Sequence, residues 1–385
     1  MPFVEYVKAG EKDFAEVVDL LNLVFGTYAP HDFELLFPAQ YNEKNFMTGT
    51  NYIVKEDGRI VANVGTYPAD YFICGDILKV SGLTSVAVSS RTRSKGYMKK
   101  LMDMAVSDMR ENGTDLSFLY GDRQRYEYFG YTPCGVRYDY SCDKNNIRHF
   151  FGNSLQSKIT LKEAGINDTG LFDEIYELYN SGKAYIKRPR ERFADIMATW
   201  ENKTIGVYNE DRFIGYLSAV KDYTSICEIQ ITEIDLLGDV INTYLETYKH
   251  YGVNITAFPY EKDLNSSLSK FAGSVSVHND NNFNVMSLVK VVNSFLKLKC
   301  ENTIIPDGSV TLSIRDTGCL TISISNNQPS VNLTNEKPDA EVTQLEAVQL
   351  IFSNYSAFSL PVLEDNIFAR CLFPIPLHVR KLDRS

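Results

Sequence analysis

Apolar and polar positions alternate along the first 140 residues with two different periods. Residues 11–25 carry Phe14, Val17, Val18 and Leu21 at helical spacing, which predicts an amphipathic helix. A second helix is predicted for residues 95–112, where methionine, leucine and alanine recur three and four residues apart and Asn112-Gly113 ends the pattern. Each helix should therefore cover one face of a sheet.

Strand patterns lie between and after these helices. Residues 51–56 and 59–67 flank the dipeptide Asp57-Gly58, which is the strongest short signal for a β-hairpin. Further strands are predicted at residues 71–80, 82–88 and 116–120. Helices and strands that alternate in this way predict a mixed α/β unit.

Two more units follow without a low-complexity linker. A helix at 170–181, a hairpin at 204–220, a strand at 225–232 and a helix at 236–251 repeat the order of elements in the first unit. The last unit begins with a helix-like stretch at 284–299, continues with strands at 309–314 and 319–325, and has a helix-like segment at 343–353. We therefore expect three domains, at residues 1–145, 146–284 and 285–385.

Composition excludes several classes of protein. The net charge of −10 argues against a nucleic-acid or anionic-membrane binder and favours cationic partners. The sequence has no secretory signal and no apolar run long enough to cross a bilayer, so a cytoplasmic protein is expected. Seven cysteines without a C-x-x-C pair and five scattered histidines give no support for a metal site.

Candidate chemistry lies between Gly82 and Met102. A strand there leads into the loop Arg93-Ser94-Lys95-Gly96, and the loop opens directly into the second helix. The first backbone N–H groups of a helix have no partner within it, and its dipole adds positive charge, so this loop can bind a pyrophosphate. Neither a Walker loop nor a G-x-G-x-x-G fingerprint is present.

Two motifs resemble those of the GNAT superfamily of N-acetyltransferases. The run V-A-V-x-x-x-x-R-S-K-G-Y, with Arg93 and Gly96, is similar to the coenzyme A pyrophosphate loop [RQ]-x-x-G-x-[GA], although Met98 stands where Gly or Ala is usual. Residues 126–131, Y-E-Y-F-G-Y, resemble the Y-x-x-F-G-[YF] run that follows the fifth strand of many of these enzymes. Nearly the whole chain resembles the Eis (enhanced intracellular survival) acetyltransferases.

This resemblance implies a fold and a cofactor site. The expected fold is mixed α+β and α/β: a GNAT domain, a degenerate second GNAT-like domain, and a C-terminal unit like sterol carrier proteins. Acetyl-CoA is the implied acyl donor, and a homohexamer is the implied assembly. The residues implied to bind the donor are Val86, Ala87, Val88, Arg93, Ser94, Lys95, Gly96, Tyr97, Met98 and Gly121.

The resemblance also implies a reaction, the direct transfer of an acetyl group to a primary amine of a small cationic molecule or of a lysine side chain. Tyr126 would be the general acid for the leaving sulfur, and the C-terminal carboxylate of Ser385 the base. Asp32 and Glu34 are alternative groups for binding the amine, or solvated loop charges. A coenzyme A-binding regulator without turnover, or a carrier of apolar ligands, remain alternative functions.

Overall fold

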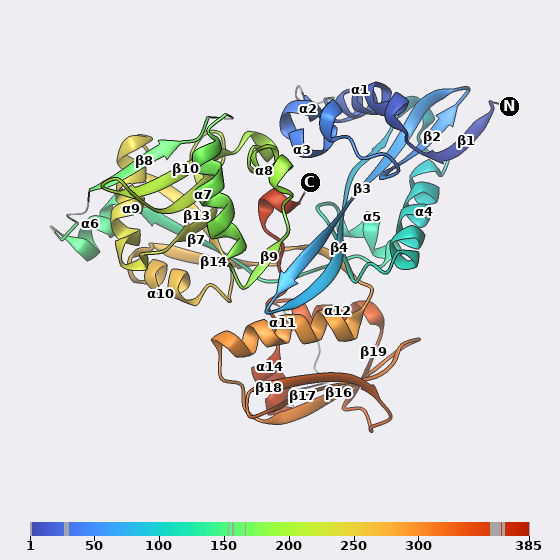
Figure 1. Cartoon of the computed structure of the whole chain (residues 1–385). Coiled ribbons are helices and arrows are strands. Elements are labelled where there is room, and N and C mark those ends of the chain that lie inside the picture. The colour runs from blue at the N-terminus through green and yellow to red at the C-terminus, as the bar shows by residue number, and fades with distance from the viewer. Residues whose placement is uncertain are drawn as a thin grey trace.

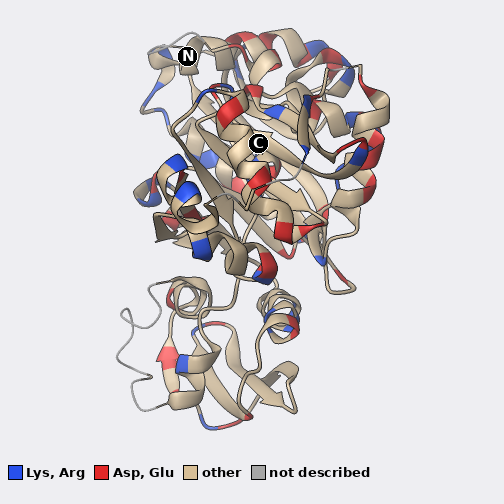
Figure 2. Ribbon diagram, turned by 90° about the vertical axis from the view of Figure 1, so that its left-hand side faces the viewer, with Lys and Arg blue, Asp and Glu red and all other residues tan. Residues whose placement is uncertain are grey.

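The structure is a computed structural model, and it describes residues 2–26, 31–152, 154–155, 158–165, 167–354, 363 and 366–384. Its strands form three sheets, each with helices packed against it (Figure 1). In the described part of the chain, no helix has the length and apolar character needed to cross a membrane. Acidic and basic residues are interspersed along the ribbon of the first two units (Figure 2).

The first sheet has the strand order β1-β2-β3-β4-β5-β15-β6, and β9 pairs with the far end of β3. All neighbouring strands are antiparallel except β4 and β5, which are parallel. The strands are β1 (Val4–Lys8), β2 (Asn51–Glu56), β3 (Arg59–Ile73), β4 (Asp76–Val88), β5 (Leu116–Leu119), β6 (Thr132–Cys134), β9 (Ala184–Ile186) and β15 (Asn281–Val285).

Two helices cover opposite faces of this sheet. Because side chains alternate along a strand, Ile53 of β2 joins the apolar cluster under α1 (Phe14–Phe25), while Tyr52 and Val54 join the cluster under α4 (Tyr97–Glu111). Shorter helices complete the unit: α2 (Phe33–Leu36), α3 (Pro38–Tyr41) and α5 (Arg123–Tyr126).

The second sheet has the order β14-β7-β13-β12-β11-β10-β8, again with a single parallel pair, β12 and β13. Its strands are β7 (Arg137–Asp143), β8 (Ile159–Glu163), β10 (Lys203–Asn209), β11 (Arg212–Ala219), β12 (Ser225–Ile231), β13 (Gly252–Ala257) and β14 (Ser274–His278). Its helices are α6 (Lys144–Phe151), α7 (Thr169–Asn180), α8 (Phe193–Met197), α9 (Leu237–Thr247) and α10 (Lys262–Phe271).

The chain crosses between these two sheets. Strand β7 lies in the second sheet although it precedes residue 145, and β15 lies in the first sheet although most of it precedes residue 285. With boundaries at 145 and 284, β7 would belong to the first domain and most of β15 to the second, but each strand pairs in the other sheet. The boundaries themselves stay a prediction.

The third unit is a four-stranded sheet of order β18-β17-β16-β19 with helices against it. Its core is continuous with the far end of the β3–β4 hairpin, where Tyr71, Ile73, Leu78 and Val80 pack against it. The elements are α11 (Leu288–Asn302), β16 (Gly308–Ile314), β17 (Gly318–Ser325), β18 (Gln328–Thr334), β19 (Ala340–Val342), α12 (Gln344–Phe352) and α14 (Ile367–Leu372). After α14 the chain returns to the space between the first two sheets (Figure 1).

Most predicted elements are confirmed, including the hairpin at Asp57-Gly58 and both helices of the first unit. The single strand predicted at residues 71–80 is wrong. Cys74 and Gly75 both have positive φ, at 46° and 87°, so the chain reverses there and the segment belongs to two strands. The helix predicted from residue 284 begins only at Leu288, because the preceding residues pair with β5.

Candidate active site

The parallel strands β4 and β5 separate partway along their length. Only three residue pairs join them, from Val80 with Leu116 to Gly82 with Phe118. Beyond Gly82, in the described part of the chain, no strand pairs with this edge of β4. The backbone groups of the last residues of β4 therefore face a gap rather than a neighbouring strand.

A β-bulge bends β4 at the same place. The register between β3 and β4 shifts between the pairs Gly65–Thr84 and Asn63–Ala87. Ser85, which lies in this stretch of β4, has a φ of 53°. The Ser85 carbonyl accepts a hydrogen bond of 2.9 Å from the side-chain amide of Asn63. Because a bulge leaves one residue unpaired and twists the strand, it helps β4 to diverge from β5.

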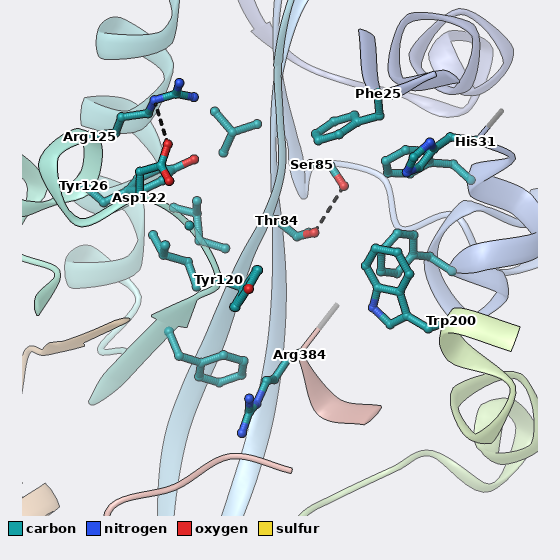
Figure 3. A pocket seen from close by; sticks show the side chains of 17 residues that line it. Phe25, His31, Thr84, Ser85, Tyr120, Asp122, Arg125, Tyr126, Trp200 and Arg384 are labelled. Carbon is teal, nitrogen blue, oxygen red and sulfur yellow. Dashed lines mark hydrogen bonds and ion pairs between the residues drawn. The ribbon is translucent and has the colours of Figure 1, made fainter. Parts of the chain in front are cut away.

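An open cavity of about 310 Å³ lies in this gap (Figure 3). One wall comes from Leu83 to Val86 of β4, and the opposite wall comes from Phe118 to Gly121 at the end of β5. Val86 is therefore beside the gap. Val88 is half-buried and packs in the same apolar cluster as Val86, whereas Ala87 is buried toward α1.

The predicted pyrophosphate loop lies between β4 and α4. Ser94 and Gly96 have positive φ, at 65° and 78°, and Gly96 is the N-cap of α4. The backbone N–H groups of the first residues of α4, starting with Tyr97 and Met98, have no partner within the helix. Successive N–H groups in such a turn form a concave site for an anion.

The two cations of this loop differ in their contacts. Lys95 is held by Glu56, with 2.6 Å between its Nζ and the carboxylate. Arg93 is exposed, and among the described residues no acidic side chain pairs with it. Arg93 is therefore the cation of this loop that can meet an added anion without breaking an ion pair.

Tyr126 lies at the end of α5 with its ring against the cavity. It is buried, and burial raises the pKa of its hydroxyl; the nearby Arg125 charge lowers that pKa and Asp122 raises it. A tyrosine in this setting stays protonated at neutral pH. It can donate a hydrogen bond to negative charge that develops in the cavity.

Gly121 makes room for that ring. A Cβ at this position would lie 2.5 Å from Cε2 of Tyr126, although the Gly121 backbone is not in the left-handed region. The Gly121 carbonyl accepts a hydrogen bond of 2.8 Å from the side-chain amide of Asn282 in β15. Asn282 was not predicted, because nothing in the local sequence indicates that β15 joins this sheet.

The far side of the cavity is aromatic. Phe25, Phe33 and Phe37 come from the region of α1 and α2, and Trp200 comes from the second unit (Figure 3). The rings of Phe37 and Trp200 meet edge to face with centroids 4.7 Å apart. His31 also lines this wall.

The two carboxylates considered for amine binding lie outside this wall. Asp32 caps α2 by accepting hydrogen bonds from the backbone N–H groups of Glu34 and Leu35 at 3.1 and 3.2 Å. Neither Asp32 nor Glu34 is among the residues that line the cavity. Ser385, the predicted base, lies outside the described residues.

A second cavity, of about 640 Å³, adjoins the first and shares Tyr120, Trp200 and Arg384 with it. Its floor is one face of the second sheet. The remaining residues that line it are Arg137, Asp139, Ser141, Ser225, Cys227, Asn254, Thr256, Ser274, Ser276, His278 and Lys381.

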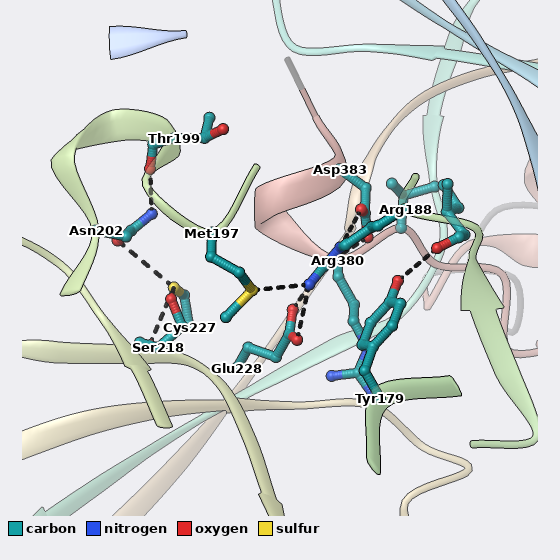
Figure 4. A network of polar contacts seen from close by, with 12 residues as sticks. Tyr179, Arg188, Met197, Thr199, Asn202, Ser218, Cys227, Glu228, Arg380 and Asp383 are labelled. Carbon is teal, nitrogen blue, oxygen red and sulfur yellow. Dashed lines mark hydrogen bonds and ion pairs between the residues drawn. The ribbon is translucent and has the colours of Figure 1, made fainter. Parts of the chain in front are cut away.

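A buried ionic network holds the C-terminal segment beside both cavities (Figure 4). Arg188 is 1% exposed and makes paired hydrogen bonds to Asp383, at 2.8 and 3.0 Å, and to Glu228, at 3.1 and 2.8 Å. Arg380 binds Glu261 at 2.8 Å. Sequence reasoning missed this network, since its partners are spread over almost 200 residues.

Comparison with known proteins agrees with this geometry. Residues 5–134 match the family described as "Acetyltransferase (GNAT) domain". No curated protein matches this sequence. Within the described part of the chain, no cluster of residues could hold a metal ion.

Several solved structures are similar over nearly their whole length. A GCN5-related N-acetyltransferase from Anabaena variabilis is 13% identical, with a TM-score of 0.67 and coverage of 98% of each chain. A probable N-acyltransferase from Enterococcus faecalis is 16% identical, with a TM-score of 0.65 and coverage of 91% of this chain and 89% of that one. Eis1 from Mycobacterium abscessus is 12% identical, with a TM-score of 0.65 and coverage of 97% and 99%.

At these identities the likeness concerns the fold. It confirms the predicted mixed α/β architecture, with two GNAT-like sheets and an additional domain. Residues 5–134 match a GNAT acetyltransferase domain, and this match supports an acetyl-CoA-dependent acyltransferase.

Proposed function

We propose that this protein is an Eis-like N-acetyltransferase that transfers an acetyl group from acetyl-CoA to a primary amine by direct attack in a ternary complex. The observation that carries the proposal is the open gap between β4 and β5, with Tyr126 at its wall. A carrier of apolar ligands that used this domain only as a scaffold would need neither a gap nor a hydroxyl donor beside it.

The donor would enter the gap in the manner of an added strand. Backbone groups of Val86, Ala87 and Val88 would hydrogen-bond the pantetheine arm, because this edge of β4 has no strand partner beyond Gly82. The pyrophosphate would bind the backbone N–H groups from Ser94 to Met98 and the Arg93 side chain. The thioester would then lie near Gly121 and Tyr126.

The acceptor must lose a proton before it attacks. An alkylamine with a pKa near 10.4 is neutral in only about one molecule in 2,500 at pH 7. Forming the neutral amine at this pH therefore costs about 4.6 kcal/mol of free energy. A base, or water leading to one, must therefore take this proton. The C-terminal carboxylate of Ser385 stays our prediction for that base, from the family resemblance.

The neutral amine nitrogen would attack the thioester carbonyl carbon, forming the amide C–N bond and breaking the C–S bond. The electron pair of that bond leaves with the sulfur. The nitrogen would then lose its extra proton, and the departing thiolate would gain one to leave as the free thiol. Tyr126 would stabilise the developing thiolate mainly by a hydrogen bond, because burial raises the pKa of its hydroxyl further above that of a thiol.

The test is thiol release from acetyl-CoA in the presence of polyamines, aminoglycosides, amino acids and lysine peptides. Tyr126→Phe should lower kcat about a hundredfold and leave the Kd of coenzyme A unchanged, since only the hydroxyl is removed. Tyr128→Phe is the matched control, because Tyr128 is 89% exposed and two residues away. Wild-type turnover in Tyr126→Phe would remove the proposed role of this residue.

Two outcomes would favour the alternative functions. Tight binding of coenzyme A without thiol release for any amine would favour a regulator. Binding of apolar ligands by the third unit, again without release, would favour a carrier. We also propose that the third unit is sterol-carrier-like and that the protein assembles as a hexamer, which a monomer in sedimentation analysis would refute.

A further inference from the structure

The second cavity is placed to receive part of the acceptor. It meets the donor cavity at Tyr120, Trp200 and Arg384, which line both. Tyr120 is 89% exposed, so its ring projects into the space that the two cavities share and does not form a buried wall between them. A molecule with its amine at the thioester can therefore extend past these side chains into the second cavity.

The charges around this second cavity are mostly positive. Arg137, Lys381 and Arg384 line it, and Asp139 is the carboxylate among the lining residues. Asp139 is already engaged, since it binds Arg137 at 3.0 Å and accepts a hydrogen bond of 2.9 Å from the hydroxyl of Thr256. A bound cation would have to compete with Arg137 for this carboxylate.

Lys381 is the cation that remains. The Arg384 guanidinium binds the carboxylate of Asp280, so its charge is matched. Across residues 2–384, as far as they are described, no carboxylate lies within ion-pair distance of the Lys381 ammonium. Among the described residues, Lys381 is thus a lining cation without an ion-pair partner, in a chain whose net charge is −10.

The position of Lys381 is fixed by its neighbours. Asp383 and Arg380 are the anchors of the buried network, so the short helical turn that carries Lys381 is held from both ends. The ammonium acts on Cys227 on the cavity floor: burial raises the pKa of the Cys227 thiol, and the Lys381 charge opposes that rise. Lys381 is itself among the residues that line the second cavity, so its charge lies beside that space.

The floor around this charge consists mainly of hydrogen-bond donors. Alternate residues of β7, β12, β13 and β14 present hydroxyl and amide groups on the face of the sheet that lacks the apolar core. These residues are Ser141, Ser225, Asn254, Thr256, Ser274 and Ser276. An ammonium with surrounding hydroxyls is a suitable set of donors for a carboxylate.

We propose that the acyl acceptor is an amine that also carries a carboxylate, and that this carboxylate binds Lys381 in the second cavity while the amine reaches the thioester. The inference rests on the proposed N-acetyltransferase activity. The resemblance implied a small cationic molecule or a lysine side chain as the acceptor. The inference narrows this to an amine that also carries a negative charge.

The experiment compares amines that differ by one carboxylate: lysine with cadaverine, and phenylalanine with phenethylamine. Initial rates of thiol release give kcat/KM, and mass spectrometry identifies the acetylated product. The wild type should prefer the carboxylate member of at least one pair by about tenfold or more. The preference should weaken as ionic strength rises.

Variants of Lys381 locate the origin of the preference. Lys381→Gln should reduce it about tenfold through a higher KM for the carboxylate acceptor, with the rate on the matched amine unchanged. Lys381→Arg should restore most of it, because the charge returns. Lys337→Gln removes the same charge from an exposed site in the third unit and should have no effect.

The outcomes separate this inference from the proposed function. Equal use of both members of each pair, or a preference that survives Lys381→Gln, would overturn the inference and leave N-acetyl transfer standing. Calorimetry with lysine adds a readout without turnover. Lysine binding that depends on Lys381, without transfer to any amine, would overturn the proposed activity and keep the carboxylate site. If neither lysine binding nor acetyl transfer is seen, both the carboxylate site and the proposed activity are overturned.

Discussion

Substitution of Gly121 by alanine tests whether the Tyr126 ring must lie where the structure places it. The added Cβ would be 2.5 Å from Cε2 and 3.2 Å from Cδ2 of that ring. Ordinary contact between carbon atoms begins near 3.5 Å, so the ring must move by about 1 Å. The Gly121 backbone itself accepts alanine, since its φ lies outside the left-handed region.

The magnitude follows from this displacement. Tyr126 is 9% exposed, so its ring has little free space and the overpacking should cost about 1–3 kcal/mol of unfolding free energy. A donor moved by about 1 Å from the developing charge should lower kcat by about a hundredfold. The Kd of coenzyme A should change little, because the loop before α4 is not touched.

Two measurements separate the steric effect from general damage. Urea titrations should give a large coupling between Gly121→Ala and Tyr126→Ala, because removal of the ring removes the clash. Thiol release should be as low in the double variant Gly121→Ala/Tyr126→Phe as in Tyr126→Phe. Gly170→Ala is the matched control: no atom lies within 4 Å of its added Cβ, and stability should change by less than about 1 kcal/mol.

The reasoning fails under either of two results. Wild-type kcat in Gly121→Ala would mean that the ring position does not matter for turnover. A stability loss that persists unchanged in the Tyr126→Ala background would mean that the added methyl group meets something other than this ring.

Two further predictions concern the loop and the core. Arg93→Ala should raise the Kd of coenzyme A about tenfold and make this Kd less dependent on salt, as measured by calorimetry. Arg315→Ala, in the third unit, is the control and should change neither. Equal effects of the two substitutions would contradict a local contact between Arg93 and the pyrophosphate. Burial lowers the pKa of His378 to about 3. Below about pH 6.5 this histidine therefore binds a proton in the unfolded state but stays neutral in the folded state. Stability should thus fall by about 2 kcal/mol from pH 7 to pH 5 through this residue, and identical pH slopes for wild type and His378→Gln in urea titrations would contradict it.

The sequence predicted those parts of the site that depend on local signals. Asp57 and Gly58 both adopt positive φ, at 50° and 81°, and the hairpin between β2 and β3 follows from that dipeptide. The predicted loop does run into α4, and its glycine, Gly96, caps that helix in the left-handed conformation. Tyr126 lies beside the same cavity as Val86 and Gly121, which were chosen from neighbouring motifs.

The parts that were not predicted depend on long-range pairing. Asn282 reaches Gly121 only because β15 inserts between β5 and β6, and Trp200 reaches Phe37 only because the second unit packs against the first. The apolar pattern at residues 284–299 fits a helix throughout, yet pairing with β5 makes its first residues a strand. Tertiary contacts override local periodicity at such positions.

The buried network around Arg188 explains why the end of the chain can take part in a site built by the first two units. Apolar packing could hold residues 379–384 against the second sheet, but it would not fix which side chains face the cavities. Removal of one partner from a buried ion pair leaves an uncompensated charge, at a cost of about 3–5 kcal/mol, so alternative placements of this segment are strongly disfavoured. Because Asp383 and Arg380 satisfy that requirement on one side, Lys381 and Arg384 are directed to the other. There Lys381 lines the second cavity and Arg384 lines both cavities. The composition of the proposed acceptor site is therefore set by contacts that lie outside the GNAT domain.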